Sequence, residues 1–254
     1  MTKKVCIFID GENFRYAICD LFPEFDATDY LPKKARWSDW FDNLVNQVTR
    51  KTSFKTERVR TYWYVIEDID FFPYKFPRVE YEADTLQRLL CKYPPYRAEL
   101  EQLSDDTLYN RMREMVSDLR GRQHEMRKRF DGWTKIQNAI SWTHDAVEFR
   151  RAGSISYDLF TNDFGKEKAV DVKLAVDMIN LRDNYDIALL VSGDQDYAPA
   201  VQAVKDFGKK VVNVVFETRN GKILGGTWRS NQHTDWTLRV DHSELHGYLF
   251  PNDH

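Results

Sequence analysis

Two carboxylates stand one residue apart in the stretch LVSGDQDYAP, directly after an apolar run. Asp194 and Asp196 follow the apolar segment 186–191, and Asp10 ends an earlier apolar segment, VCIFID. If both segments are parallel strands of one open sheet, their carboxyl ends meet at the edge where ligands bind. The sequence therefore predicts that carboxylates from two strands lie together at this edge.

A predicted helix adds Asp171 near its start. Clustered carboxylates repel one another and are costly to remove from water, and a divalent cation offsets that cost. Magnesium takes oxygen ligands and is usually held by one or two carboxylates, waters and a substrate phosphate. Such an ion can activate water and stabilise an in-line phosphoryl displacement. The joint placement of these carboxylates at strand ends and at one helix start favours a metal site.

Each acid also has a structural explanation. Asp196 suits the N-cap of the helix that follows, whereas Asp194 has no equally good one. Asp171 could complement a helix N-terminus. Asp177, six residues later, could pair with Lys173 one turn earlier. It lies roughly 120° around the helix from Asp171, so both reach one site only at its margins.

The elements that must position these residues follow from apolar patterning. Strands are expected at 5–10, 58–66, 147–160, 186–193 and 209–216, with 147–160 either one strand or a hairpin turning near Gly153. Helices are expected at 13–22, 37–50, 166–183 and 196–208, the last with Gly208 at its C-cap. The alternation in the last third predicts right-handed parallel crossovers. The tail after Phe216 has no secure assignment.

Residues 84–146 have a different pattern. Apolar residues recur there at steps of three and four: Leu108, Met112, Met115, Leu119, Met126, Phe130 and Trp133. This pattern is typical of a long amphipathic helix or a helical hairpin. We expect a single domain over 1–254 with 84–146 as a helical insertion.

The insertion is also basic. Between 111 and 135 it has eight basic residues against four acidic ones. Its densest positive run is Arg127, Lys128 and Arg129, beside Phe130 and Trp133, which could stack on bases if exposed. Three interpretations stay open: a solvated helix face, a basic wall that guides single-stranded RNA, and a seam for a homo-oligomer.

Composition limits the classes of protein. The 254 residues are 42% hydrophobic, enough for a sizeable core. A net charge of −3 excludes a global basic field, so a nucleic acid would need a local patch. No apolar run approaches 18 residues, so no membrane span is expected. Three cysteines without CxxC spacing fit a reducing cytoplasm, the expected location.

Three blocks of this sequence together resemble a known family. FIDGEN, KAVDVKLAVD and LLVSGDQDYAPAVQAVKDFGKKV are similar to the signature blocks of the NYN domain, in the PIN-like nuclease superfamily. Two departures are mild: Glu12 lies inside the first block, and Tyr197 stands where Phe is usual. The larger departure is the insertion at 84–146. The resemblance covers about 1–66 and 147–216.

The resemblance implies an α/β fold of the PIN-like type, a three-layer sandwich with a central, mainly parallel sheet. It implies a ribonuclease that depends on Mg²⁺ or Mn²⁺, with Asp10, Asp171, Asp194 and Asp196 as metal-binding catalytic acids. Asn13, otherwise explained as a helix N-cap, would position an acid or a phosphate. Ser192 would shape the turn or bond an acid. Asp177 matches a frequent acid of the pattern.

Three functions compete. The first is a metal-dependent endoribonuclease that cleaves RNA phosphodiester bonds. The second is a non-catalytic PIN-like module that binds RNA or a protein. The third is a phosphohydrolase with an aspartyl nucleophile, which is disfavoured because its motif needs an aspartate where this sequence has Glu12.

Overall fold

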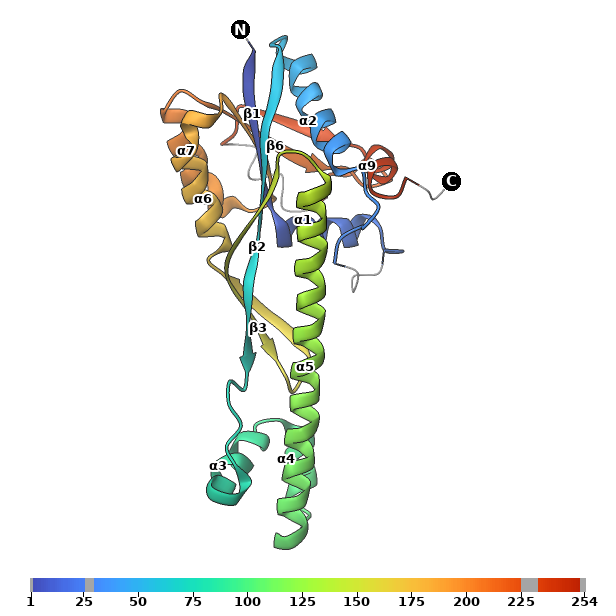
Figure 1. The fold of residues 1–254 in the computed structure, drawn as a ribbon, viewed down its shortest axis with the longest axis vertical. Coiled ribbons are helices and arrows are strands. Elements are labelled where there is room, and N and C mark those ends of the chain that lie inside the picture. Colours follow the sequence, from blue (N-terminus) through green and yellow to red (C-terminus); the bar gives the residue numbers. More distant parts are fainter. Residues whose placement is uncertain (1, 26–29, 225–232, 252–254) are drawn as a thin grey trace. The chain divides into compact units, whose positions relative to one another are not determined.

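A seven-stranded sheet with flanking helices forms the centre of the computed structural model, which describes residues 2–25, 30–224 and 233–251 (Figure 1). The strands are β1 (Lys3–Asp10), β2 (Thr56–Phe72), β3 (Val147–Asp158), β4 (Asp163–Lys168), β5 (Ile187–Val191), β6 (Lys210–Phe216) and β7 (Trp236–Val240). Their order across the sheet is β4-β3-β2-β1-β5-β6-β7. The pairs β2–β1, β1–β5, β5–β6 and β6–β7 are parallel. The predicted α/β fold with a mainly parallel sheet is therefore confirmed.

The helices are α1 (Gly11–Leu21), α2 (Trp37–Thr52), α3 (Val79–Leu90), α4 (Pro94–Leu100), α5 (Asp105–Thr143), α6 (Val170–Asn180), α7 (Ala198–Asp206) and α9 (His242–Leu249). Two 3₁₀ turns, η2 (Arg182–Asn184) and η3 (Gln195–Tyr197), precede β5 and α7. No helix among the described residues is long and apolar enough to cross a membrane.

The chain forms two compact units. Unit 1 comprises Met1–Glu67, Trp133–Gly153 and Lys168–His254, and unit 2 comprises Asp68–Gly132 and Ser154–Glu167. The elements β2, β3 and α5 each begin in one unit and end in the other. The expected single domain with an insertion at 84–146 stays a prediction.

Unit 1 has three layers. In Figure 1, α6 and α7 lie on one side of its strands, and α2 and α9 lie on the other. Residues 5–10 of β1 and all of β5 are buried, as expected for central strands covered on both faces. An aromatic cluster joins α1 and α2 to the sheet, with Phe14 stacked on Trp40 at a ring separation of 5.1 Å and next to Trp63. This core fixes α1 directly after β1.

Unit 2 has its own core, built around α5. The stripe residues Met112, Met115, Leu119 and Met126 are buried, and Tyr93 and Tyr96 contact the ring of Phe160. Arg122 donates to the carbonyls of Leu159 and Phe160. The predicted amphipathic helix is thus one continuous helix of 39 residues.

The predicted boundaries were partly correct. Of the two alternatives for 147–160, the single strand is confirmed, because residues 147–158 form one strand through Gly153. A Cβ at Gly153 would lie 1.7 Å from the Lys168 carbonyl oxygen, so glycine is required by close approach rather than by a turn. The helix expected at 166–183 starts at Val170, because residues 166–168 belong to β4. In α7, Phe207 is the C-cap and Gly208 follows with φ of 76°.

Candidate metal centre

Asp10 is the most constrained acid of the predicted set. It ends β1 and caps α1, and its side chain is almost fully buried, at 4% exposure. Its Oδ1 accepts the Asn13 backbone N–H at 3.1 Å, and its Oδ2 accepts the hydroxyls of Ser192 at 3.0 Å and Tyr197 at 3.1 Å. Burial, with a contribution from nearby Asp171, raises the pKa of Asp10 to about 6, although these hydrogen bonds oppose the shift.

Asp171 is brought to the same point by α6. It lies in the first turn of that helix, and its Oδ1 accepts the Tyr197 hydroxyl at 2.9 Å. Tyr197 is buried, and its hydroxyl lies within hydrogen-bonding distance of both Asp10 and Asp171. Burial and the two carboxylates raise the pKa of Tyr197, so the hydroxyl keeps its proton. The structure thus brings two of the four predicted acids together.

The loop after β5 supplies the polar bonds around this pair. β1 and β5 are in register, with Ile9 opposite Val191, so Asp10 and Ser192 leave the sheet at the same edge. The Gly193 backbone N–H donates to the Asn13 side-chain oxygen at 3.0 Å. This bond ties the start of α1 to the loop. Asn13 and Ser192 therefore have the supporting contacts expected of them, although Asn13 is not the N-cap of its helix.

The structure gives the cap to Asp194 rather than to Asp196. Asp194 caps η3, because its carboxylate accepts the Asp196 backbone N–H at 2.9 Å. Its own N–H donates to Ser192 Oγ at 3.1 Å, which places Asp194 beside the pair. Asp196 is exposed and is not a helix N-cap. The cap explanation for Asp196 was wrong, and it belongs to Asp194 instead.

Asp177 belongs to a different cluster. It is buried, and it accepts hydrogen bonds from Arg150, from Lys173 at 3.0 Å and from the Tyr64 hydroxyl at 3.2 Å. The structural explanation, a pair with Lys173, is confirmed. A carboxylate paired with two cations has little need of a metal ion. Asp177 is therefore better explained as a residue that anchors α6 to β2 and β3.

The donor set fits one kind of metal site. Within the described ranges, no group of three or more His, Cys, Asp or Glu side chains is arranged to hold an ion. The described residues at this edge therefore do not form a site in which protein side chains supply all the metal ligands. Two neighbouring carboxylates, Asp10 and Asp171, match the sites in which magnesium keeps several waters and binds a substrate phosphate.

Two residues of this region escaped the sequence analysis. The Tyr197 hydroxyl, noted only as a mild departure, is the atom that joins Asp10 to Asp171. Gly11 is needed because a Cβ there would lie 2.3 Å from the Tyr64 carbonyl oxygen. The sequence feature that could have pointed to Tyr197 is a hydroxyl at a helix start that is expected to be buried. The contact of Gly11 with β2 could not be seen in the sequence.

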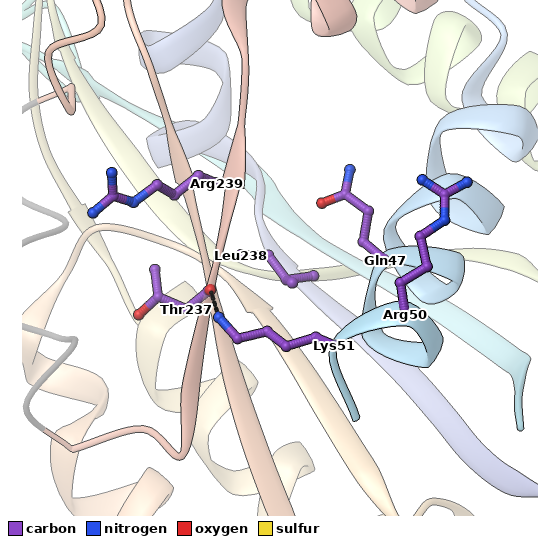
Figure 2. Close-up of a pocket in the computed structure, with 6 residues that line it drawn as sticks. All are labelled: Gln47, Arg50, Lys51, Thr237, Leu238 and Arg239. Atoms are coloured by element: carbon purple, nitrogen blue, oxygen red, sulfur yellow. Dashed lines mark hydrogen bonds between the residues drawn. The ribbon is translucent and has the colours of Figure 1, made fainter. Parts of the chain in front are cut away.

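A hollow in unit 1, of about 430 Å³, is basic (Figure 2). It lies between α2 and β7 and includes Arg50, Lys51 and Arg239. Lys51 donates to the Thr237 carbonyl at 2.9 Å, and Arg239 pairs with Glu217 at 3.3 Å. Figure 2 shows Arg50 and Arg239 pointing away from each other. These cations do not converge on one anion, so we assign no site to this hollow.

The family model of the NYN domain matches residues 98–224, which is half of the chain. The matched segment includes Asp171 and Asp194 and excludes Asp10. The search of curated proteins found no match.

Three solved structures show distant similarity. A protein of unknown function from Vibrio parahaemolyticus is 14% identical, with 94% of each chain covered and a TM-score of 0.41. The T5 D15 protein co-crystallized with metal ions is 13% identical, with 83% of this chain and 54% of that chain covered and a TM-score of 0.31. T5 5'-exonuclease with bound zinc is 13% identical, with 87% and 58% covered and a TM-score of 0.30.

Proposed function

The chain belongs to the NYN domain family, and from this premise we propose that it is a metal-dependent ribonuclease that cleaves RNA phosphodiester bonds. The observation that supports the proposal is the meeting of Asp10 and Asp171 at one hydroxyl, at the carboxyl edge of the parallel strands. The buried Asp10, with its raised pKa, gains most from a cation that stabilises its charged form.

In this proposal Asp10 and Asp171 hold a Mg²⁺ or Mn²⁺ ion, with Asp194 and Asp196 at the rim of the same loop. The ion would supply charge stabilisation for the phosphoryl group and a more acidic water. Asn13 and Ser192 keep Asp10 oriented through the loop after β5. Such fixed carboxylates avoid reorganisation when the substrate phosphate arrives.

RNA is the proposed substrate, with the basic run of α5 as a contact for its backbone. Arg127 and Lys128 are exposed, so phosphates can reach them. Trp133 is buried and stacked on Tyr30 at 4.9 Å, so it cannot stack on a base. A homo-oligomer through α5 stays a prediction, and its seam would need residues other than the buried methionines of the stripe.

The test is cleavage of matched single-stranded RNA and DNA oligonucleotides with Mg²⁺, with Mn²⁺ or with chelator. We expect wild type to cleave RNA only when a cation is present. Asp10→Asn and Asp171→Asn should each reduce the rate at least about a hundredfold, since even residues that only orient metal ligands cost 10- to 100-fold. Asp183→Asn, a change at an exposed acid of η2, is the matched control and should cleave normally.

The non-catalytic module is the second candidate. It is favoured by the lack of a three-ligand acidic cluster in the described part of the chain. RNA binding without cleavage under any cation would support it. Undiminished cleavage by both Asp variants would show that the activity resides elsewhere.

A further inference from the structure

The Tyr197 hydroxyl lies between the two carboxylates that would share a cation in the proposed function. Its oxygen lies 3.1 Å from Asp10 Oδ2 and 2.9 Å from Asp171 Oδ1. The ring is 1% exposed, and Tyr197 is the last residue of η3, which the Asp194 side chain caps directly before α7. A side chain held in this way cannot swing into solvent when an ion arrives.

One hydroxyl has a single proton to donate, while two carboxylates compete for it. Asp10 does not depend on Tyr197 for its orientation, because the Asn13 N–H and the Ser192 hydroxyl already bind it. The third donor at Asp10 instead occupies one of the lone-pair positions that would otherwise be open to a cation. Asp171 likewise offers the hydroxyl an oxygen that it would offer an ion.

On the basis of the proposed function, we propose that the Tyr197 hydroxyl is a built-in competitor of the divalent cation. It links the two carboxylates when the ion is absent and weakens their grip on the ion when it is present. The site therefore fills only at a higher cation concentration than the same acids would need with a phenyl ring at this position. Tyr197 thus acts through the two acids by setting their metal affinity and not by orienting Asp10.

Tyr197→Phe tests this with two readouts that move in opposite directions. In chelator, the variant should melt a few degrees below wild type, because the two carboxylates lose their shared donor. Mn²⁺ binding would be followed by melting temperature and by calorimetry. The Mn²⁺ concentration at half-saturation should fall about fivefold, as expected from removing one competing hydrogen bond. A residue with only a packing role would lower stability without tightening metal binding.

Tyr64→Phe is the matched control. Tyr64 is also buried, and its hydroxyl also binds a buried carboxylate, that of Asp177. Loss of the Tyr64 hydroxyl should lower the melting temperature in chelator. It should leave the Mn²⁺ concentration at half-saturation unchanged. The contrast between the two Tyr→Phe variants isolates the hydroxyl that lies between Asp10 and Asp171.

The outcomes separate this inference from the function on which it rests. If wild type responds to Mn²⁺ and Tyr197→Phe needs the same or more cation, competition is overturned while the metal site survives. If Tyr197→Phe is as stable as wild type in chelator, the link between the two acids is overturned whatever the metal does. If wild type does not respond to Mn²⁺ or Mg²⁺, the metal site of the proposed function fails first.

Discussion

Asp10 is a single residue whose burial should be visible in the pH dependence of stability. Its pKa in the folded protein is about 6, above the ordinary value of 3.8. Because the folded value is raised, the neutral carboxyl stabilises the fold below about pH 4, and that contribution is lost as the pH rises through 6. At pH 7, without metal, the charged form costs on the order of 3 kcal/mol.

Asp10→Asn should therefore melt several degrees above wild type at pH 7 in chelator, and the difference should shrink toward zero at pH 4. The gain is below the full cost, since an amide accepts hydrogen bonds through one oxygen only. Thermal melts of both proteins between pH 4 and 8 would measure it, with Asp183→Asn, a change at an exposed acid, as the control. A difference that stays constant across this range would contradict the assignment.

At the same scale, the sequence indicated which side chains meet but not how they bond. Asp10, Asp194 and Asp196 were expected at one edge because strand ends define that edge. The hydrogen bonds of Asp194 and Asp196 depend on a single 3₁₀ turn, η3, which no periodicity reveals. The contact of Asp177 with Arg150 joins residues 27 positions apart, and such a pair has no local signal.

Among the elements, the junction of β1 and α1 depends on Gly11. A Cβ at this position would lie 2.3 Å from the Tyr64 carbonyl oxygen and 2.8 Å from Val65 Cγ1, both on β2. Gly11→Ala must push α1 away from β2, and Asp10 and Asn13 would move with it. We expect a loss of about 1–3 kcal/mol, typical of overpacking, and a weaker response of the melting temperature to Mn²⁺.

Gly121→Ala provides the matched control for this change in urea denaturation. Gly121 lies inside α5, and a Cβ there meets no atom within 4 Å. Alanine in an open helical position should stabilise the protein by about 1 kcal/mol. Equal effects of the two substitutions would show that the contact of Gly11 with β2 is not a constraint.

The elements were predicted best where burial is simplest. β1, α2 and β6 are buried on continuous or regular faces, and their patterns are clear in the sequence. The edge strand β4, DFGKEK, has little buried surface, so its sequence has no apolar pattern that would predict a strand. For α5, periodicity alone could not distinguish one long helix from a hairpin, because a turn can preserve the same stripe.

For the whole molecule, a net charge of −3 means that RNA must be attracted locally. If Arg127, Lys128 and Arg129 each contact a phosphate, their replacement by Gln should reduce the slope of log affinity against log salt by at most about 2. Binding would be measured across a salt series in calcium, to suppress cleavage. Arg50→Gln, in the hollow of Figure 2, should leave the slope unchanged. Identical slopes for the triple variant and wild type would end the case for this contact.

The six tryptophans among the described residues all fall in unit 1, and the sequence of unit 2 has none. Tryptophan fluorescence, excited at wavelengths that tyrosine hardly absorbs, therefore reports the unfolding of unit 1 alone. Trp37, Trp40 and Trp63 lie in the aromatic core of this unit. The helical signal in circular dichroism, in contrast, also includes the part of α5 that lies in unit 2. Since β2, β3 and α5 run through both units, we expect the two signals to change at the same urea concentration. Separate midpoints would show that unit 1, which contains the acids, can fold and unfold independently of unit 2.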